Sequence, residues 1–203
     1  MKHRVMIIDD EQSVRDSLSA VLATYGFRSA SCGNAHEALE TIRKSTPDCV
    51  VLDVRMPEID GLALQRMLAQ TAANLPVIII TGHADIAMAV QAMRNGASDF
   101  IEKPIDDEQL VASIQAAIAQ NPHASRSGPD EKSLLARLAT LTERERSVAE
   151  MVAEGYSSAA IAAAFSISVR TVDHHRASIL AKMQATSLPQ LIRYLLRILP
   201  PKT

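Results

Sequence analysis

Five polar side chains follow short apolar runs of the chain, at points where buried strands would end. They are Asp9 and Asp10 after residues 5–8, Asp53 after residues 49–52, Thr81 after residues 77–80, and Lys103 after residues 99–101. Three carboxylates in one crevice repel one another unless a cation or a lysine joins them. Carboxylate oxygens with room for water suit Mg²⁺. An aspartate beside Mg²⁺, with a hydroxyl and an ammonium nearby, can accept a phosphoryl group as an acyl phosphate.

The apolar pattern of residues 1–120 predicts the elements that would bring these side chains together. Continuous apolar runs such as residues 77–80 are typical of parallel strands buried on both faces. Five such strands alternating with five helices predict a doubly wound α/β fold, whose ligands bind at the carboxyl ends of the strands. The alternative is that strand-end aspartates only form turns. It accounts poorly for five polar residues at the ends of four strands.

Four motifs resemble the receiver domain of two-component response regulators, over residues 4–119. They are Ile8-Asp9-Asp10-Glu11, Leu52-Asp53-Val54-Arg55-Met56-Pro57 with Asp60-Gly61, Ile80-Thr81-Gly82-His83, and Phe100-Ile101-Glu102-Lys103-Pro104. The resemblance implies a (βα)5 fold with the flavodoxin-like strand order 2-1-3-4-5. It also implies that Asp53 is phosphorylated. Mg²⁺ would be held by Asp10 directly, by Asp9 through water, by Asp53, and by the backbone carbonyl of Arg55.

The same resemblance assigns roles to the remaining motif residues. Thr81 would bond a phosphoryl oxygen, and Lys103 would pair with the phosphate charge. Phe100 stands at the family's switch aromatic, where core packing and switching are compatible because the rotamer changes its burial. The Lys103–Pro104 bond is often cis in the family. Arg55 and His83 hold positions that tune dephosphorylation, although simple surface placement remains an equal alternative.

Residues 121–203 differ from the first part in charge and in periodicity. The first 120 residues carry ten lysines and arginines against sixteen acids, net −6, whereas the rest carry eleven against seven, net +4. An acidic part joined to a basic part suggests phosphate or cation chemistry in one and nucleic acid in the other. We predict a receiver at 1–120, a linker with some helix at 121–138, and a DNA-binding domain at 139–203.

Four short helices are expected at about 142–153, 158–164, 168–183 and 187–198, with no strand after residue 105. Thr142 with Glu145 three residues later forms a capping box for the first helix, and Ser168 would cap the third. Four short helices joined by tight turns on a basic background favour a helix-turn-helix domain. A helical dimerisation module is the alternative that periodicity alone leaves open.

The third of these helices has two distinct faces. An inner stripe would contain Val169, Val172, Ile179 and Met183. The DNA-binding candidates lie on or beside the opposite face: Arg170, Thr171, Asp173, His174, Ala177, Ser178 and Lys182. Arg170 and Lys182 would contact phosphates, Asp173 would accept from a cytosine amino group, and His174 would donate to guanine. A solvated helix face is the alternative. Arg176 leans inward and would pair with Glu143 or Glu145.

The C-terminal run resembles the LuxR-type DNA-binding domain over about 139–198. The resemblance rests on Leu141-Thr142-Glu143-Arg144-Glu145-Arg146, Glu154-Gly155-Tyr156-Ser157, Ile161-Ala162, Ile167-Ser168-Val169-Arg170-Thr171-Val172 and Ala181-Lys182-Met183-Gln184-Ala185. With the receiver motifs, the whole chain resembles the FixJ subfamily. Two departures bear on target sequence and affinity: Ser158-Ala159 stands where the family has an Asn-Lys pair, and His174 replaces a small aliphatic residue.

These resemblances imply a phosphorylation-controlled regulator. A histidine kinase would phosphorylate Asp53. The change would spread through a surface built from residues 85–94, 99–101 and 107–119, and the chain would form a homodimer that binds promoter DNA. Release of the basic domain from the receiver is an open alternative. We expect activation of transcription with RNA polymerase as a further partner. The chain would not be an enzyme beyond catalysing its own phosphotransfer and slow dephosphorylation.

Two other functions compete with this one. The receiver could be a phosphate sink whose second domain docks a protein, or it could be vestigial beside a constitutive DNA binder. The basic residues of the C-terminal part argue against the first, and the complete acidic motif argues against the second. No membrane span or signal peptide is visible, so a cytoplasmic location without membrane attachment is expected.

Overall fold

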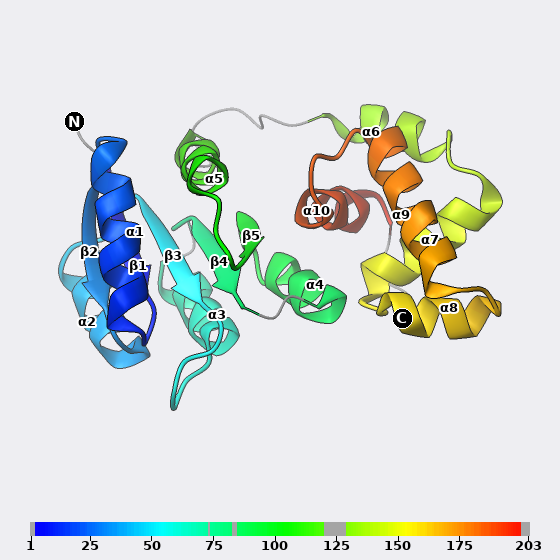
Figure 1. The fold of residues 1–203 in the computed structure, drawn as a ribbon. Coiled ribbons are helices and arrows are strands. Elements are labelled where there is room, and N and C mark those ends of the chain that lie inside the picture. Colours follow the sequence, from blue (N-terminus) through cyan, green and yellow to red (C-terminus); the bar gives the residue numbers. More distant parts are fainter. Residues whose placement is uncertain (1–2, 73, 83–84, 120–128, 200–203) are drawn as a thin grey trace. The chain divides into compact units, whose positions relative to one another are not determined.

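The computed structural model (Figure 1) describes residues 3–72, 74–82, 85–119 and 129–199. The chain forms two compact units. The first contains residues 1–83 and 95–126, and the second contains residues 84–94 and 127–203.

The first unit is built on one five-stranded parallel sheet. Its strands are β1 (Arg4–Ile8), β2 (Arg28–Cys32), β3 (Cys49–Asp53), β4 (Val77–Thr81) and β5 (Asp99–Glu102). They lie in the order β2-β1-β3-β4-β5, which confirms the predicted fold. The strand order reverses next to β1 and β3, so these two strands form the switch point where such sheets bind ligands.

Helices cover both faces of this sheet because its central strands are apolar on both sides. The helices of the unit are α1 (Gln12–Thr24), α2 (Ala35–Lys44), α3 (Gly61–Thr71) and α5 (Asp107–Ala119). α1 and α5 share one core with alternate residues of the strands, including Ile7, Val51 and Ile80. Neighbouring strand residues such as Ile8 and Leu52 are also fully buried. The sheet is therefore a rigid base for the loops at its carboxyl edge.

The loop after β3 depends on a glycine. The N–H of Gly61 donates to the carbonyl of Val54 at 2.8 Å, and a Cβ placed on Gly61 would lie 2.8 Å from the Cα of Val54. Asp60 caps α3 by accepting a hydrogen bond from the N–H of Ala63 at 2.8 Å. The chain that leaves Asp53 is thus folded back tightly onto its own strand.

The second unit is entirely helical in its described residues. Its helices are α4 (Ile86–Arg94), α6 (Glu131–Leu138), α7 (Glu143–Glu154), α8 (Ser158–Phe165), α9 (Val169–Met183) and α10 (Leu188–Ile198). The predicted capping box of Thr142 and Glu145 is present, and Ser168 caps α9 as expected. Gly155 ends α7 in the left-handed conformation with φ 95°, which a residue without Cβ adopts at little cost.

Three features of this unit differ from expectation or extend it. Val169 was predicted on the inner stripe of α9 but is 45% exposed, because it is the first residue of the helix. The predicted linker contains α6, whose Arg137 donates to the carbonyl of Met183 at 3.0 Å and so joins α6 to the end of α9. Helix α4 lies within the predicted receiver range, but its contacts group it with α7 and α10.

Candidate functional site

Lys103 bridges two buried carboxylates at the carboxyl edge of the sheet. Its Nζ lies 2.9 Å from Oδ2 of Asp9 and 2.8 Å from Oδ1 of Asp53. Asp9 follows β1 and Asp53 ends β3, so the two acids come from the strands at the switch point. Their exposed fractions are 1% and 4%. Buried acids this close repel each other, and the shared ammonium offsets that repulsion.

The electrostatics of this cluster reflect the competition between burial and pairing. Burial raises the pKa of Asp53, and hydrogen bonding and attraction from Lys103 only partly oppose the shift. Burial lowers the pKa of Lys103, but the hydrogen bonds to Asp53 and Asp9 outweigh it, so the lysine pKa rises above its usual value. Lys103 is therefore protonated at neutral pH, and Asp53 has lost part of its hydration.

The other predicted receiver residues occupy distinct positions around this cluster. The backbone N–H of Arg55 donates to the Asp53 carboxylate, while its side chain is exposed. Thr81 ends β4 and is fully buried, and Phe100 lies on β5 at 5% exposure. Asp10 is exposed beside the buried Asp9. The Lys103–Pro104 bond is cis, as the resemblance implied. His83 lies outside the described residues.

The acids have the right donor chemistry for Mg²⁺, but they do not form a closed ligand cage. Within the described ranges, no three histidine, cysteine or acidic side chains converge closely enough to hold a metal ion. Asp9 and Asp53 nevertheless supply two carboxylates against the ammonium of Lys103, and the exposed Asp10 follows Asp9 in the chain. The surplus negative charge and the oxygen-only donors fit a hard divalent cation.

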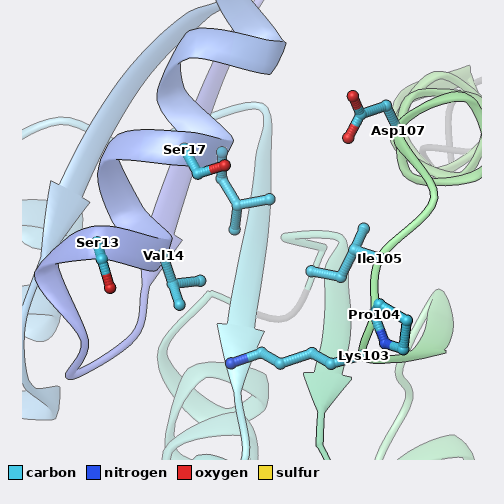
Figure 2. Close-up of a pocket in the computed structure, with 8 residues that line it drawn as sticks. Ser13, Val14, Ser17, Lys103, Pro104, Ile105 and Asp107 are labelled. Carbon is cyan, nitrogen blue, oxygen red and sulfur yellow. The ribbon is translucent and has the colours of Figure 1, made fainter.

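A groove adjoins the cluster on the α1 side (Figure 2). It encloses about 320 Å³ and is lined by Ser13, Val14, Ser17, Leu18, Lys103, Pro104, Ile105 and Asp107. Val14 on α1 and Ile105 in the loop after β5 face each other across it. Lys103 belongs to both the groove and the acid cluster, so a molecule seated in the groove would lie against the lysine that pairs with Asp53.

The predicted DNA-binding residues of α9 fall into two groups. Five are exposed at the start or on the outer side of the helix: Arg170, Thr171, Asp173, His174 and Ala177. Ser178 and Lys182 are partly buried and both bond Glu145 of α7, at 2.6 Å and 2.7 Å. Lys182 is thus held by an acid of its own domain, which weakens its expected role as a phosphate contact.

Glu145 has a larger structural role than its sequence position indicated. One carboxylate oxygen accepts from Ser178, and the other accepts from Lys182 and from the backbone N–H of Thr142 at 2.8 Å. The hydrogen bond from Lys182 contributes most to lowering the pKa of Glu145 to about 2. The capping box was the available signal for the position, but the contacts with α9 were not readable from local sequence.

Arg176 was predicted to pair with Glu143 or Glu145, and this was wrong. Its Nη1 instead donates to Ser158 Oγ at 2.8 Å and lies 3.4 Å from Asp173 Oδ1. Ser158 also donates to Asp173 at 3.1 Å. Arg176 contacts α8 rather than α7, and the carboxylate of Glu145 already pairs with Lys182. The replacement at Ser158 therefore ties α8 to the outer side of α9.

Two family models match the chain. The response regulator receiver domain matches residues 5–115, which is more than half of the chain. The family of bacterial regulatory proteins, luxR family, matches residues 139–195. No helix in the described ranges has the length and apolar character needed to cross a membrane.

Similar proteins extend over nearly the whole chain. The transcriptional regulatory protein FixJ of Bradyrhizobium diazoefficiens is 40% identical over 196 residues, covering 97% of this chain and 96% of FixJ. FixJ of Rhizobium meliloti is 42% identical over 195 residues, covering 94% of each. The crystal structure of full-length FixJ from B. japonicum is 40% identical, covers 97% of both chains and superimposes with a TM-score of 0.58. The chain therefore belongs to the FixJ-like two-component response regulators, and it is a transcription regulator with a LuxR-type DNA-binding domain.

Proposed function

We propose that a histidine kinase phosphorylates this regulator on Asp53, and that the phosphorylated form dimerises, binds promoter DNA and activates transcription. The observation that carries the proposal is the bridge from Lys103 to Asp9 and Asp53. It places an ammonium against the buried carboxylate at the end of β3, beside a second acid and a backbone donor from Arg55.

Each receiver residue has a defined part in this proposal. Asp53 accepts the phosphoryl group, and Lys103 pairs with the added charge. Receiver domains generally bind Mg²⁺ at the phosphorylation site. Asp9, Asp10, Asp53 and the carbonyl of Arg55 would hold it here, and it would neutralise charge on the transferred group. Catalysis in such transfers is mostly positioning and electrostatic stabilisation, so the receiver assists its own phosphorylation and slow dephosphorylation.

Thr81 and Phe100 are the proposed switch. Thr81 lies on the strand next to β3, and Phe100 is on the strand beyond it. A phosphoryl group on Asp53 would draw the Thr81 hydroxyl, and the space it vacates would allow the buried Phe100 to change its position. The surface made by residues 85–94, 99–101 and 107–119 would then favour a second copy of the chain.

Dimerisation would raise DNA affinity through effective concentration. Two α9 helices on paired half-sites bind as one unit once the chains are joined. Arg170, Thr171, Asp173, His174 and Ala177 form the exposed face offered to the major groove, with Ser178 and Lys182 at its edge. RNA polymerase would be a later partner, and the cytoplasm is where we place these encounters.

Release of α4 is the second way in which phosphorylation would act. Ile86, Ala89 and Val90 of α4 are buried, and Arg94 donates to the carbonyl of Ala153 on α7 at 3.1 Å. Part of the proposed pairing surface is therefore covered by helices of its own unit. Dimerisation through α4 requires that these contacts open first.

Selection of genomic DNA fragments by the purified protein tests the proposal. Fragments are recovered with and without acetyl phosphate, and binding to them is measured at two salt concentrations. We expect enrichment of a common sequence by the treated protein and a steep decrease of affinity with salt. A receiver that takes up phosphate while the protein binds no DNA at low salt would instead indicate a phosphate sink.

A further inference from the structure

Arg15, in the first turn of α1, contacts the backbone of both aspartates that follow β1. Its Nη1 donates to the carbonyl of Asp9 at 2.6 Å and to the carbonyl of Asp10 at 2.9 Å, and its Nη2 donates to Gln12. The strand ladder ends at Ile8. The guanidinium therefore supplies donors to carbonyls that lie beyond the ladder.

These hydrogen bonds fix the backbone of Asp9 and Asp10 through their carbonyl groups. The side chain of Asp9 is held as well, because one carboxylate oxygen accepts from the N–H of Glu11 at 2.9 Å and the other accepts from Lys103 at 2.9 Å. Asp10 is exposed, and the orientation of its peptide is set by Arg15. Arg15 thus holds the backbone of both residues, while Glu11 and Lys103 hold the carboxylate of Asp9.

The seat of the guanidinium is shaped by a second loop. A Cβ placed on Gly33, after β2, would lie 3.4 Å from Nη1 of Arg15. Gly33 is itself anchored, because its N–H donates to Glu37 of α2 at 3.1 Å. Arg15 is therefore packed between two loops at the carboxyl edge of the sheet, and it is partly buried there.

We propose that Arg15 is a positioning residue for phosphoryl transfer, which holds the Asp9–Asp10 peptide in the orientation that binds a divalent cation. The proposal rests on the proposed function of Asp53. Arg15 itself would touch neither the cation nor the phosphoryl group. Fixing ligands before binding lowers the ordering cost of the bound state, and loss of such supporting contacts commonly weakens metal sites by about 10–100-fold.

The sign of the effect separates positioning from simple electrostatics. A guanidinium next to Asp9 and Asp10 repels a cation that binds there, so removing its charge alone should tighten Mg²⁺ binding. Removing its hydrogen bonds should instead loosen it. Arg15→Met removes both the charge and the donors, so the direction of its effect shows which contribution is larger. Arg15→Lys keeps the charge but replaces the planar fork with a single ammonium.

Mg²⁺ affinity is measured by isothermal titration calorimetry on the full chain. We expect the dissociation constant to rise about tenfold or more in Arg15→Met, with Arg15→Lys between it and the wild type. Arg43→Met is the matched control, because it removes the same charge from the last turn of α2. Unchanged or tighter binding in Arg15→Met overturns the proposal.

A second readout keeps the two proposals apart. With acetyl phosphate, Arg15→Met should need more Mg²⁺ for half-maximal phosphorylation but reach a rate within about twofold of wild type at saturation, because Arg15 only positions ligands. A large loss of rate at saturating Mg²⁺ would contradict this.

If the wild type itself binds no Mg²⁺, the proposed function fails. If the wild type binds and Arg15→Met binds equally, only the role of Arg15 fails. Thermal unfolding confirms that each variant is folded. If Arg15→Met does not fold, the Mg²⁺ affinity of Arg15→Lys tests the role of Arg15 instead.

Discussion

Lys103 neutralises part of the charge that the receiver concentrates at one edge of its sheet. The lysine side chain is 23% exposed, and the two carboxylates it bridges are nearly inaccessible to water. Removing one partner from a buried ion pair leaves the other charge without hydration or pairing. The lysine therefore stabilises the resting receiver in addition to its proposed contact with phosphate.

Lys103→Met should lower the free energy of unfolding by about 3 kcal/mol at neutral pH without added metal. Added Mg²⁺ should restore part of the loss, since a cation can replace the ammonium. Urea denaturation followed by circular dichroism measures both effects. Lys44→Met is the control, because Lys44 is 79% exposed and pairs with Glu40 at 3.9 Å. Such an exposed pair contributes about 0–1 kcal/mol. Equal losses in the two variants would contradict this account.

Individual residues of the receiver were predictable because each stands at a strand end. Asp9, Asp53 and Lys103 are far apart in sequence, but parallel topology sends all three to one edge. No such rule places long side chains on helices. Lys182 and Arg176 were assigned from a helical wheel, but Lys182 pairs with Glu145 of α7 and Arg176 donates to Ser158 of α8, and periodicity identifies no partner on another helix.

At the scale of single elements, the loop between β3 and α3 positions Asp53. Gly61 allows its backbone to approach Val54 closely, and the N–H of Arg55 reaches the Asp53 carboxylate from the same loop. A side chain at Gly61 would move this loop relative to the strand.

Gly61→Ala should reduce stability by about 1–3 kcal/mol, because the backbone must shift to admit the methyl group. Differential scanning calorimetry provides the measurement. Gly82→Ala is the matched control, since a Cβ there has nothing within 4 Å, and its effect should stay within about 0.5 kcal/mol. The close approach would be irrelevant if both variants unfolded at the same temperature.

Glu145 links α7 to the recognition helix α9, and this link should depend on pH. Its pKa in the folded chain is about 2, below the usual 4.5, mainly because of Lys182. A lowered carboxyl pKa contributes stability above pH 4.5, and the contribution is lost as pH falls from 4.5 toward 2.

Glu145→Gln should therefore destabilise the folded chain at pH 7, by about 1–3 kcal/mol, and the difference from wild type should shrink between pH 4.5 and pH 2. Calorimetry over this pH range tests it. Glu143→Gln, an exposed change in the same first turn, should change little. A difference that stays constant with pH would rule out the ion pair as its cause.

The elements themselves were largely predictable, with their contacts as the exception. Apolar runs located the strands, and caps such as Thr142 and Ser168 located helix starts. The burial of α4 against α7 and α10 could not be predicted from the sequence, because an amphipathic pattern shows that one helix face is buried but not which element covers it. The exposure of Val169 has the same origin, since a helix's first turn extends past the surface that covers the rest.

At the scale of the whole molecule, the basic character of residues 121–203 predicts that this part of the chain contacts the DNA phosphates. Arg170 is exposed at the start of α9, the end that enters a groove first in helix-turn-helix proteins. Arg170→Ala should weaken binding to all sequences alike and reduce the salt slope by about one. Arg197→Ala, which removes the same charge from α10, is the control. Fluorescence anisotropy at several salt concentrations measures the slopes, and identical slopes would exclude a phosphate contact at Arg170.

The central claim is that a phosphoryl group on Asp53 controls DNA binding. The most direct test is the DNA affinity of wild type and Asp53→Asn, each measured by fluorescence anisotropy before and after treatment with acetyl phosphate and Mg²⁺. We predict that treatment raises the affinity of the wild type about tenfold or more through dimerisation and leaves Asp53→Asn unchanged. An equal increase in both proteins, or none in either while Asp53 is shown to be phosphorylated, would contradict the claim.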